Sequence, residues 1–277
     1  MRIRILMFFG LLCTTSLHTT TRADHYEVFI VAGQSNCDGR GQAKDLTGPL
    51  AKWAKPQEDV KIAYSCSSLR GAVQTSEGFK PLQPGWSVAP GKNKPAKLPS
   101  TTFGPEVAFG RGVADHLKGK HVAIIKFAEG GTSLAKDWNP DVKDRLYTAF
   151  HVFMQKSLKD LNGQGHTATI RGMIWHQGES DAALSEAEYT KMLTALVTRV
   201  RTDLKTPDLP FGIGEVFDNG KRGSVRKAQK AVADTVMGAF FVSAAGLKTS
   251  DMGTHFDTAS QITLGERFAA GMVNALK

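Results

Sequence analysis

The stretch that decides the fold is VFIVAGQSN, from Val28 to Asn36. Its first five residues are all apolar, and an unbroken apolar run of this length is typical of a parallel strand covered on both faces. Gly33 ends the run, so Ser35 follows the carboxyl end of the strand, at the edge where doubly wound sheets bind ligands. Ser35 is therefore a candidate nucleophile. From this segment alone, a serine that caps a helix is an equally good interpretation.

Apolar runs and amphipathic segments alternate along the rest of the chain. Strands are predicted at 27–32, 60–64, 122–127, 170–175 and 211–216, with a weaker one at 239–242. Apolar residues recur at helical spacing in segments 106–117, 146–161, 186–204, 224–236 and 260–276. This alternation predicts an α/β fold, a doubly wound parallel sheet of about five strands with helices on both faces. The sequence has no repeats and no linker, so residues 24–277 are predicted to form a single domain.

The first 23 residues differ from the rest. Arg2 and Arg4 precede the apolar stretch 5–12, and Ala23 ends a polar, threonine-rich stretch. A basic start, a short apolar core and a small residue at the cleavage point are the features of a signal peptide, and the apolar stretch is far too short to span a bilayer. Residues 1–23 are thus predicted to be removed on export. The product is expected to be secreted or periplasmic, with no stable membrane insertion.

Charge and cysteine content narrow the classes of partner. The chain has 35 basic and 26 acidic residues, but the basic ones are scattered through amphipathic segments and mixed with acids. Nucleic-acid binding needs a localised basic patch, so no nucleic-acid partner is expected. Two cysteines, Cys37 and Cys66, remain after the predicted export, which would permit a disulfide between them. Neither has metal-ligand spacing, and no metal site is predicted.

One long segment, residues 67–102, interrupts the alternation. It is rich in Gly, Pro, Ser and Lys and shows no sustained periodicity, and a stretch of this kind in a compact domain is usually functional or mobile. The segment contains Trp86, whose ring would suit the C–H face of a sugar. Trp138, farther along the chain, is a second candidate for stacking on a sugar. The alternative is that Trp86 only anchors the long segment to the core.

Three further polar segments follow predicted strands or precede the last helix. Gly130 and Gly131 come after the third predicted strand, and WHQGESD, from Trp175 to Asp181, comes at the end of the fourth. The segment DMGTHFD, starting at Asp251, precedes the last predicted helix. All of these segments would meet Ser35 at the carboxyl edge of the sheet.

At this point the sequence resembles the SGNH hydrolases, in particular the branch with sialate O-acetylesterase domains and acetylxylan esterases of carbohydrate esterase family six. The matching strings are VAGQSN ending at Asn36, FGPE ending at Glu106, GGTS starting at Gly130, WHQGESD and His255-Phe256, in the family's order. The resemblance implies a flavodoxin-like three-layer sandwich and a secreted serine esterase that removes acetyl groups from carbohydrate, without a metal or other cofactor.

Carried over position by position, Ser35 resembles the family's nucleophile and His255 the base that takes its proton. The resemblance implies an oxyanion hole made by the backbone N–H of Ser35, a glycine N–H at Gly130 or Gly131, and the side chain of Gln177. Such donors stabilise the negative charge that develops on the acyl oxygen in the transition state.

The acid that orients His255 is where the sequence departs from its family. The family usually places an Asp three residues before the His, but Met252 stands there and Asp251 is four residues before. Asp251 would reach the ring if the loop is one residue longer, and Glu179 of the WHQGESD segment is the alternative. A helper carboxylate only needs to reach the ring nitrogen opposite the serine, so both remain candidates.

Two other functions are compatible with these residues. One is an esterase or lipase for other small acyl esters, because a fold does not determine a substrate. The other is a catalytically silent carbohydrate-binding domain that uses Trp86 and Trp138 as stacking platforms. The presence of Ser35, Gln177 and His255 together argues against a silent domain.

Overall fold

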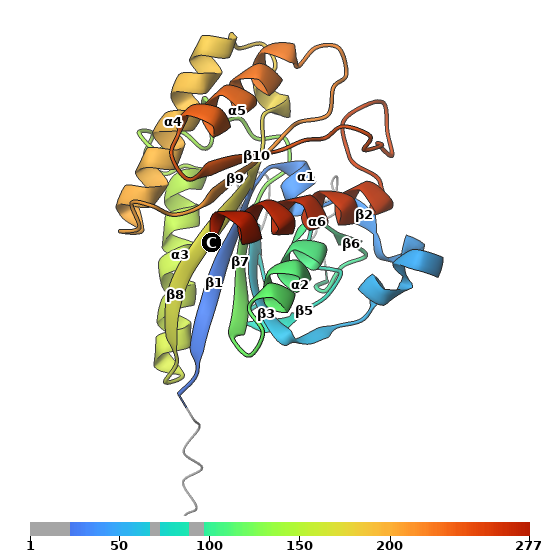
Figure 1. Cartoon of the computed structure of the whole chain (residues 1–277), viewed down its shortest axis with the longest axis vertical. Helices are drawn as coiled ribbons and strands as arrows, with labels where there is room; N and C mark the ends of the chain where they lie inside the picture. Colours follow the sequence, from blue (N-terminus) through green and yellow to red (C-terminus); the bar gives the residue numbers. More distant parts are fainter. Residues whose placement is uncertain (1–22, 67–72, 89–96) are drawn as a thin grey trace, which may run out of the picture.

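The computed structural model describes residues 23–66, 73–88 and 97–277. Within these residues a sheet of eight strands contains six that run parallel, in the order β10-β9-β8-β1-β7-β3 (Figure 1). The parallel strands are β1 (His25–Gly33), β3 (Gln57–Cys66), β7 (His121–Ala128), β8 (Thr167–His176), β9 (Phe211–Gly214) and β10 (Ala239–Val242). The predicted parallel sheet is confirmed, and all six predicted runs form strands. The predicted signal peptide, 1–23, lies outside the described residues except for Ala23.

Strand β1 lies in the middle of the sheet, between β7 and β8. Taken in chain order, the parallel strands are arranged 2-3-1-4-5-6, whereas flavodoxin has the order 2-1-3-4-5. The similarity to flavodoxin therefore lies in the layers and not in the order of the strands. After β1 the chain forms β3 and β7 on one side of β1, and it then forms β8, β9 and β10 on the other side. The order of the strands therefore reverses at β1. Doubly wound sheets bind ligands at this point.

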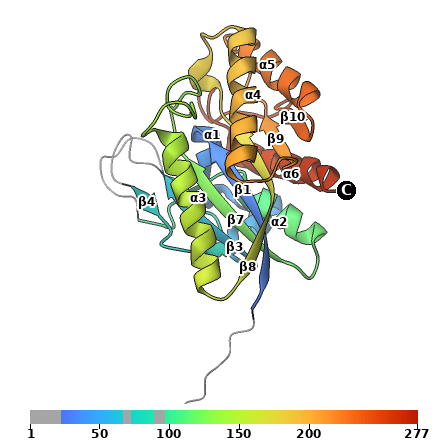
Figure 2. The ribbon, with the colours of Figure 1, turned by 90° about the vertical axis from the view of Figure 1, so that its left-hand side faces the viewer.

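Helices cover both faces of the sheet, as predicted (Figure 2). Successive residues of β1 point to opposite faces: Val28 and Ile30 enter one core, and Phe29 and Val31 enter the other. The first core is covered by α3 (Leu146–Gly163), α4 (Glu186–Asp203) and α5 (Gly223–Thr235), and the second by α2 (Glu106–His116) and α6 (Thr258–Ala275). In the part of the chain that the structure describes, no helix is long and apolar enough to cross a membrane.

The helix boundaries follow from local hydrogen bonding. Helix α4 begins with a capping box, in which the Ser185 side chain and the backbone N–H of Glu188 pair while the Glu188 side chain accepts from the N–H of Ser185. Helix α6 begins at a cap formed by Asp257, whose carboxylate accepts from the N–H of Ser260. This second cap lies two residues after His255, so it fixes the end of the loop that contains this histidine.

The described parts of the segment 67–102, residues 73–88 and 97–102, have more regular structure than their sequence predicts. Strands β4 (Gln74–Thr75) and β5 (Lys80–Leu82) both pair antiparallel with β3. Farther along, β6 (Thr102–Phe103) pairs with β2 (Gly41–Gln42). Strands this short have too few residues for a visible alternation of polar and apolar side chains, which is why the pattern missed them. Residues 74–82 of this segment therefore line the edge of β3 that faces away from β7.

The two cysteines of the described chain do not form a disulfide. Cys37 and Cys66 are both buried and free. Burial raises the pKa of both thiols, and a thiol that stays protonated is a poor nucleophile. The disulfide that export would permit is therefore absent, and both side chains act as small apolar groups in the core.

The turn after β1 depends on Gly33, which adopts φ +148°. A Cβ atom at this position would lie 2.1 Å from the carbonyl oxygen of His176. We predict that Gly33→Ala destabilises the fold by about 3 kcal/mol, since backbone and not a flexible side chain must move. The melting temperature should then fall by roughly 6–12 °C. Calorimetry of the purified variant measures this shift.

Gly163→Ala is the matched control for this substitution. Gly163 ends helix α3, and an added Cβ atom there would meet nothing within 4 Å. Its melting temperature should stay within about 2 °C of the parent, because Ala is the better helix former and no atom is displaced. Equal melting temperatures for the two variants would show that the turn after β1 does not require a glycine at position 33.

Candidate active site

Ser35 lies at the turn between β1 and the short helix α1 (Ser35–Asp38), at the carboxyl edge of the sheet (Figure 1). It does not cap this helix, because Gln34 occupies the N-cap position and no side chain makes a capping hydrogen bond. The backbone N–H of Gln34 instead donates to the carbonyl oxygen of His176, which ties the turn to the end of β8. The Ser35 hydroxyl is thus free to take part in chemistry.

The hydroxyl of Ser35 faces the imidazole of His255. Ser35 Oγ lies 3.1 Å from His255 Nε2, and Nδ1 of the same ring lies 2.6 Å from Asp251 Oδ2. Because a carboxylate can only accept, Nδ1 carries the ring proton and Nε2 is left to accept from the serine hydroxyl. This alignment can move the serine proton to the imidazole as the hydroxyl oxygen attacks a carbonyl carbon.

The carboxylate of Asp251 is held by the chain that follows it. Partial burial raises its pKa, but hydrogen bonds from the backbone N–H groups of His255 and Thr254 and from the His255 ring outweigh burial and lower it. The two N–H groups reach Oδ1 at 2.9 and 2.8 Å, which leaves Oδ2 for the ring. Asp251 is therefore ionised at neutral pH and faces the imidazole in one orientation.

The extra residue in this loop is accommodated by a tight turn. The N–H of Gly253 donates to the carbonyl oxygen of Asp251, and Gly253 adopts the left-handed φ of +86°. Met252 projects outward and is fully exposed. The turn brings the Asp251 side chain back over the loop to His255, so a spacing of four residues places the carboxylate beside the ring.

Glu179 does not contact His255. Its Oε1 accepts from the side-chain amide of Asn36 at 2.6 Å and lies 3.9 Å from Nδ1 of His176. Of the two candidate acids, Asp251 is therefore the one that the structure places beside the imidazole. The sequence left both open because the position of a loop acid depends on how the loop folds.

Asn36 joins the serine turn to the histidine loop. Its Nδ2 donates to Glu179 and also to the carbonyl oxygen of Thr254 at 2.8 Å, while its Oδ1 accepts from the N–H of Phe256 at 3.0 Å. These contacts flank His255 on both sides along the chain. Asn36 stands in the GQSN string, but nothing in the sequence alone distinguished its role from that of a helix cap.

Gly130, which follows β7, lies beside the serine turn. A Cβ atom added to Gly130 would lie 3.3 Å from Ser35 Cβ, so a side chain there would crowd the nucleophile. None of the residues that the structure describes accepts a hydrogen bond from the backbone N–H of Gly130 or of Ser35. Gly131 adopts φ +70°, which favours glycine. The N–H of Gly130 is thus available to donate to a group bound at Ser35, and its predicted role in an oxyanion hole stays a prediction.

Gln177 is not free to serve as the side-chain donor that the sequence predicts. Its Nε2 lies within hydrogen-bond distance of Gln34 Oε1, Thr132 O and Asp181 Oδ2, at 3.1, 3.1 and 2.5 Å. Its Oε1 accepts from the Tyr189 hydroxyl at 3.0 Å, and the side chain has no exposed surface. The predicted role is therefore wrong for this structure: the amide braces neighbouring loops and does not face a substrate.

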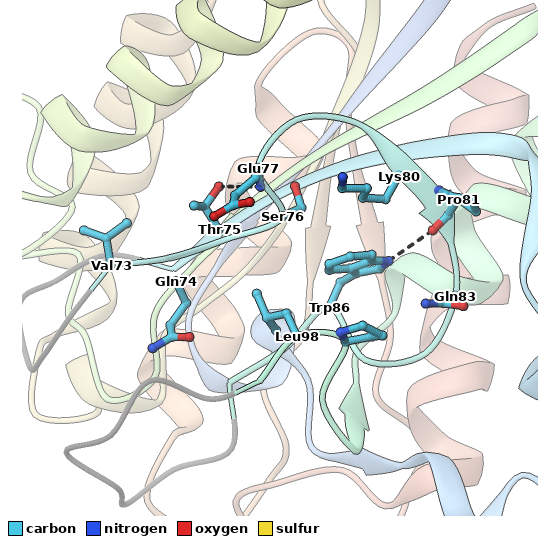
Figure 3. A pocket seen from close by; sticks show the side chains of 11 residues that line it. Val73, Gln74, Thr75, Ser76, Glu77, Lys80, Pro81, Gln83, Trp86 and Leu98 are labelled. Carbon is cyan, nitrogen blue, oxygen red and sulfur yellow. Dashed lines mark hydrogen bonds between the residues drawn. The ribbon is translucent and has the colours of Figure 1, made fainter.

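Neither tryptophan offers an open ring face. Trp138 is completely buried, packs edge-to-face on Trp175 at 4.9 Å and donates its indole N–H to Thr132 Oγ1, so its predicted stacking role is wrong. Trp86 is 4% exposed and donates its indole N–H to the carbonyl oxygen of Pro81 (Figure 3). It borders a polar groove of about 560 Å³, which none of Ser35, Asp251 and His255 lines. Its contacts are those of an anchor for the long segment.

A group of buried charged residues packs against the serine turn, and no pattern in the sequence predicted it. Lys126 is fully buried and donates to Glu106 Oε2 at 2.8 Å and to the carbonyl oxygens of Asp38 and Trp86, both at 2.6 Å. Asp38 in turn pairs with Arg40 at 2.7 Å. A lysine in an apolar run is invisible to pattern analysis, because its acceptors come from three distant segments.

Comparison with known proteins identifies the family. The family model for carbohydrate esterases described as sialic acid-specific acetylesterase matches residues 25–274, nearly the whole described chain. The chain belongs to this family. The esterase is 27% identical over 247 residues to the probable carbohydrate esterase At4g34215 of Arabidopsis thaliana, covering 86% of this chain and 87% of the relative. Family membership makes the chain an enzyme of the carbohydrate O-acetylesterase type, and argues against a silent sugar-binding domain.

Solved structures share the fold of the esterase. The Arabidopsis protein AT4G34215 superposes with a TM-score of 0.70 at 23% identity, covering 91% of this chain and 99% of that protein. NanS superposes with a TM-score of 0.61 at 16% identity, covering 92% and 98%. XAC1771, a carbohydrate acetylesterase from Xanthomonas citri, gives 0.62 at 16% identity, covering 88% of this chain and 55% of that protein. The layers described above are therefore shared with these three proteins.

The two acids can be compared by variants that keep shape and remove charge. We predict that Asp251→Asn lowers kcat by about 10³- to 10⁴-fold with little change in KM, because an amide no longer selects the ring tautomer that accepts the serine proton. Glu179→Gln should cost less than about tenfold, since its Oε1 can still accept from Asn36. Kinetics on p-nitrophenyl acetate measures both. A crippled Glu179→Gln beside an active Asp251→Asn would reverse the assignment.

Proposed function

We propose that the protein is a secreted serine esterase that hydrolyses acetyl esters on carbohydrate through an acetyl-serine intermediate. The observation that carries the proposal is the alignment of Ser35, His255 and Asp251 at the carboxyl edge of the sheet, with contacts of 3.1 and 2.6 Å. A fully formed alignment of this kind is what a nucleophilic mechanism needs, and a domain that only binds sugar has no use for it. Membership of the carbohydrate esterase family supports the choice of substrate class.

In the first half of the proposed reaction, Ser35 Oγ attacks the acetyl carbonyl carbon and its proton passes to His255 Nε2. The bond between that carbon and the sugar oxygen then breaks, and the imidazolium gives its proton to the leaving oxygen. In the second half, water attacks the acetyl-serine with His255 again as the base, releasing acetate and restoring the hydroxyl. The ionised Asp251 stabilises the imidazolium in both halves by accepting from Nδ1.

The developing negative charge falls on the former carbonyl oxygen. The backbone N–H groups of Ser35 and Gly130 are the donors we assign to it, because both are free of other acceptors in the described chain and both lie at the nucleophile. Donors fixed by the backbone need no reorganisation when the charge appears, and one of them contributes about 3–4 kcal/mol to the barrier in comparable sites.

Export is part of the proposal and rests on the leader sequence and on where the sheet begins. Ala23 is the predicted cleavage point, and the next residue, Asp24, already accepts a hydrogen bond from the N–H of Thr167. Strand β1 starts at the following residue. Cleavage after residue 23 would thus keep the contacts of the sheet that the structure describes from Asp24 onward.

The covalent role of Ser35 has a direct test. Ser35→Ala should abolish hydrolysis of p-nitrophenyl acetate, with a loss of several orders of magnitude in kcat, because no other group can form the acyl intermediate. The melting temperature should stay close to the parent value, since only the bond to His255 is lost. A variant with most of the parent activity would refute the mechanism.

Substrate class is tested by the same variant. Acetate release should be measured from acetylated xylan, pectin, sialic acid and sulfated polysaccharides, with Ser35→Ala as the blank. We expect release from at least one acetylated carbohydrate with a higher kcat/KM than on p-nitrophenyl acetate. Activity on simple aryl and alkyl esters alone would instead favour a general esterase.

The pH dependence should show one step. The base accepts a proton only when its imidazole is unprotonated, so kcat/KM should rise with pH through a single step in the neutral range. Asp251, whose pKa is lowered, is ionised throughout this range and adds no second step. Initial rates between about pH 5 and 9 in constant ionic strength measure the profile. A flat profile would exclude a histidine base.

A further inference from the structure

The oxyanion hole assigned above has two backbone donors but no side-chain donor, because the amide of Gln177 is engaged elsewhere. Turning this amide toward Ser35 would break its hydrogen bonds inside a closed core, and each buried group left unpaired costs about 1–3 kcal/mol. A different side chain must therefore be found if a third donor faces the acyl oxygen. The requirement is a polar hydrogen beside Ser35 and Gly130 that has no acceptor of its own.

Arg40 meets this requirement. Its side chain is 8% exposed, and its Nη1 donates to Asp38 Oδ2 at 2.7 Å and to the carbonyl oxygen of Gly39 at 2.6 Å. These two bonds fix the plane of the guanidinium. Among the described residues, nothing accepts from Nη2, and Nε is enclosed without a partner. The side chain is thus buried, held in place and left with unused donors.

The free end of the guanidinium lies at the nucleophile. A Cβ atom added to Gly130 would lie 2.7 Å from Arg40 Nη2 and 3.3 Å from Ser35 Cβ. The two groups therefore border the same small volume above Gly130, which is open only because this residue has no side chain. Nη2 therefore lies on the same side of Gly130 as the side chain of Ser35, which is where an acyl group on Oγ would begin.

Arg40 faces its partner with one end of the guanidinium only. Asp38 accepts from Nη1, and also from the Tyr64 hydroxyl at 2.8 Å, the Ser87 hydroxyl at 3.2 Å and the N–H of Val88 at 3.2 Å. The Nη2 end shares the delocalised positive charge of the guanidinium and makes none of these contacts with Asp38. In a site with little water, such a charge stabilises a developing anion more than it would in solution.

We propose that Arg40 is a catalytic residue of this esterase, whose Nη2 donates to the acyl oxygen as it becomes negatively charged. The proposal rests on the proposed function and replaces Gln177 as the third donor. A charged donor makes a shorter and stronger bond to an oxyanion than to a neutral carbonyl. Its contribution should therefore appear in the transition state and hardly at all in substrate binding.

Gln34 is the alternative donor near Ser35. Its Nε2 also has no acceptor in the described chain, but its Oε1 is held toward Gln177 Nε2 and the N–H of Gly178, on the β8 side of the turn. The contacts that place a group against both Ser35 and Gly130 belong to Arg40. Arg40 is also the one of the two that has a charge to oppose the oxyanion.

The test compares Arg40→Gln with the parent and with Ser87→Ala. Arg40→Gln should lower kcat on p-nitrophenyl acetate by about 10²- to 10³-fold, with KM within about twofold, as loss of one oxyanion donor does elsewhere. Arg40→Lys should recover part of kcat if its ammonium reaches the same volume. Ser87→Ala removes a hydroxyl that donates to Asp38 and to the carbonyl oxygen of Gly39, the two acceptors of Arg40 Nη1, but leaves the guanidinium present. It should therefore keep at least a third of the parent kcat.

Covalent labelling of Ser35 by a fluorophosphonate gives a second readout, because its adduct also places an oxygen in the oxyanion hole. Arg40→Gln should slow labelling by a similar factor at an unchanged melting temperature. Retention of more than a third of both rates would overturn the proposal, and so would an equal loss in Ser87→Ala. A parent that is labelled but releases no acetate from any ester would refute the proposed function, and the labelling rates would still decide the role of Arg40.

Discussion

The site depends on one side chain, the amide of Asn36, which connects the serine turn to the histidine loop. Its Nδ2 and Oδ1 bind the backbone on either side of His255, at Thr254 and Phe256. An amide can do this because it offers donors and an acceptor on separate atoms, whereas a carboxylate can only accept and would leave the Thr254 carbonyl oxygen unpaired. Because Asn36 directly follows Ser35 in the chain, its hydrogen bonds to Thr254 and Phe256 also hold the Ser35 hydroxyl close to the His255 imidazole. Glu179 completes the arrangement by holding the other hydrogen of the amide.

The serine turn is also held by buried charges that would be costly if they were not fully hydrogen-bonded. Lys126 forms an ion pair with Glu106 and donates to the carbonyl oxygens of Asp38 and Trp86. These three partners come from α2, α1 and the long segment. Removal of one partner would leave an uncompensated charge in the core, so these segments can hardly separate without a large loss of stability. The buried charges thus hold the serine turn in one position. Arg40 belongs to the same group of residues through its ion pair with Asp38, and its Nη2 borders Gly130 at the site.

Two errors of the sequence analysis have the same physical origin. Trp138 was expected on a sugar-binding surface and is buried, and Gln177 was expected to face the substrate and braces the loops behind it. An aromatic ring or an amide suits either role equally well, because both combine an apolar body with hydrogen-bonding groups. Which role a residue takes depends on the direction of its side chain, and at the ends of strands that direction follows from turns and not from any period in the sequence.

The sequence by itself determined the parallel sheet, the helices on both faces, and the meeting of Ser35 and His255 at one edge. These follow from apolar runs and helical spacing, which record burial over many residues and tolerate local exceptions. Only the tertiary structure decided between Asp251 and Glu179, because a turn at Gly253 returns one carboxylate to the ring while Asn36 takes the other. It alone also revealed the short strands that line the edge of β3, and the charges packed against the serine turn. Contacts between residues far apart in the chain leave no periodic trace, so their partners become visible only when the chain is folded.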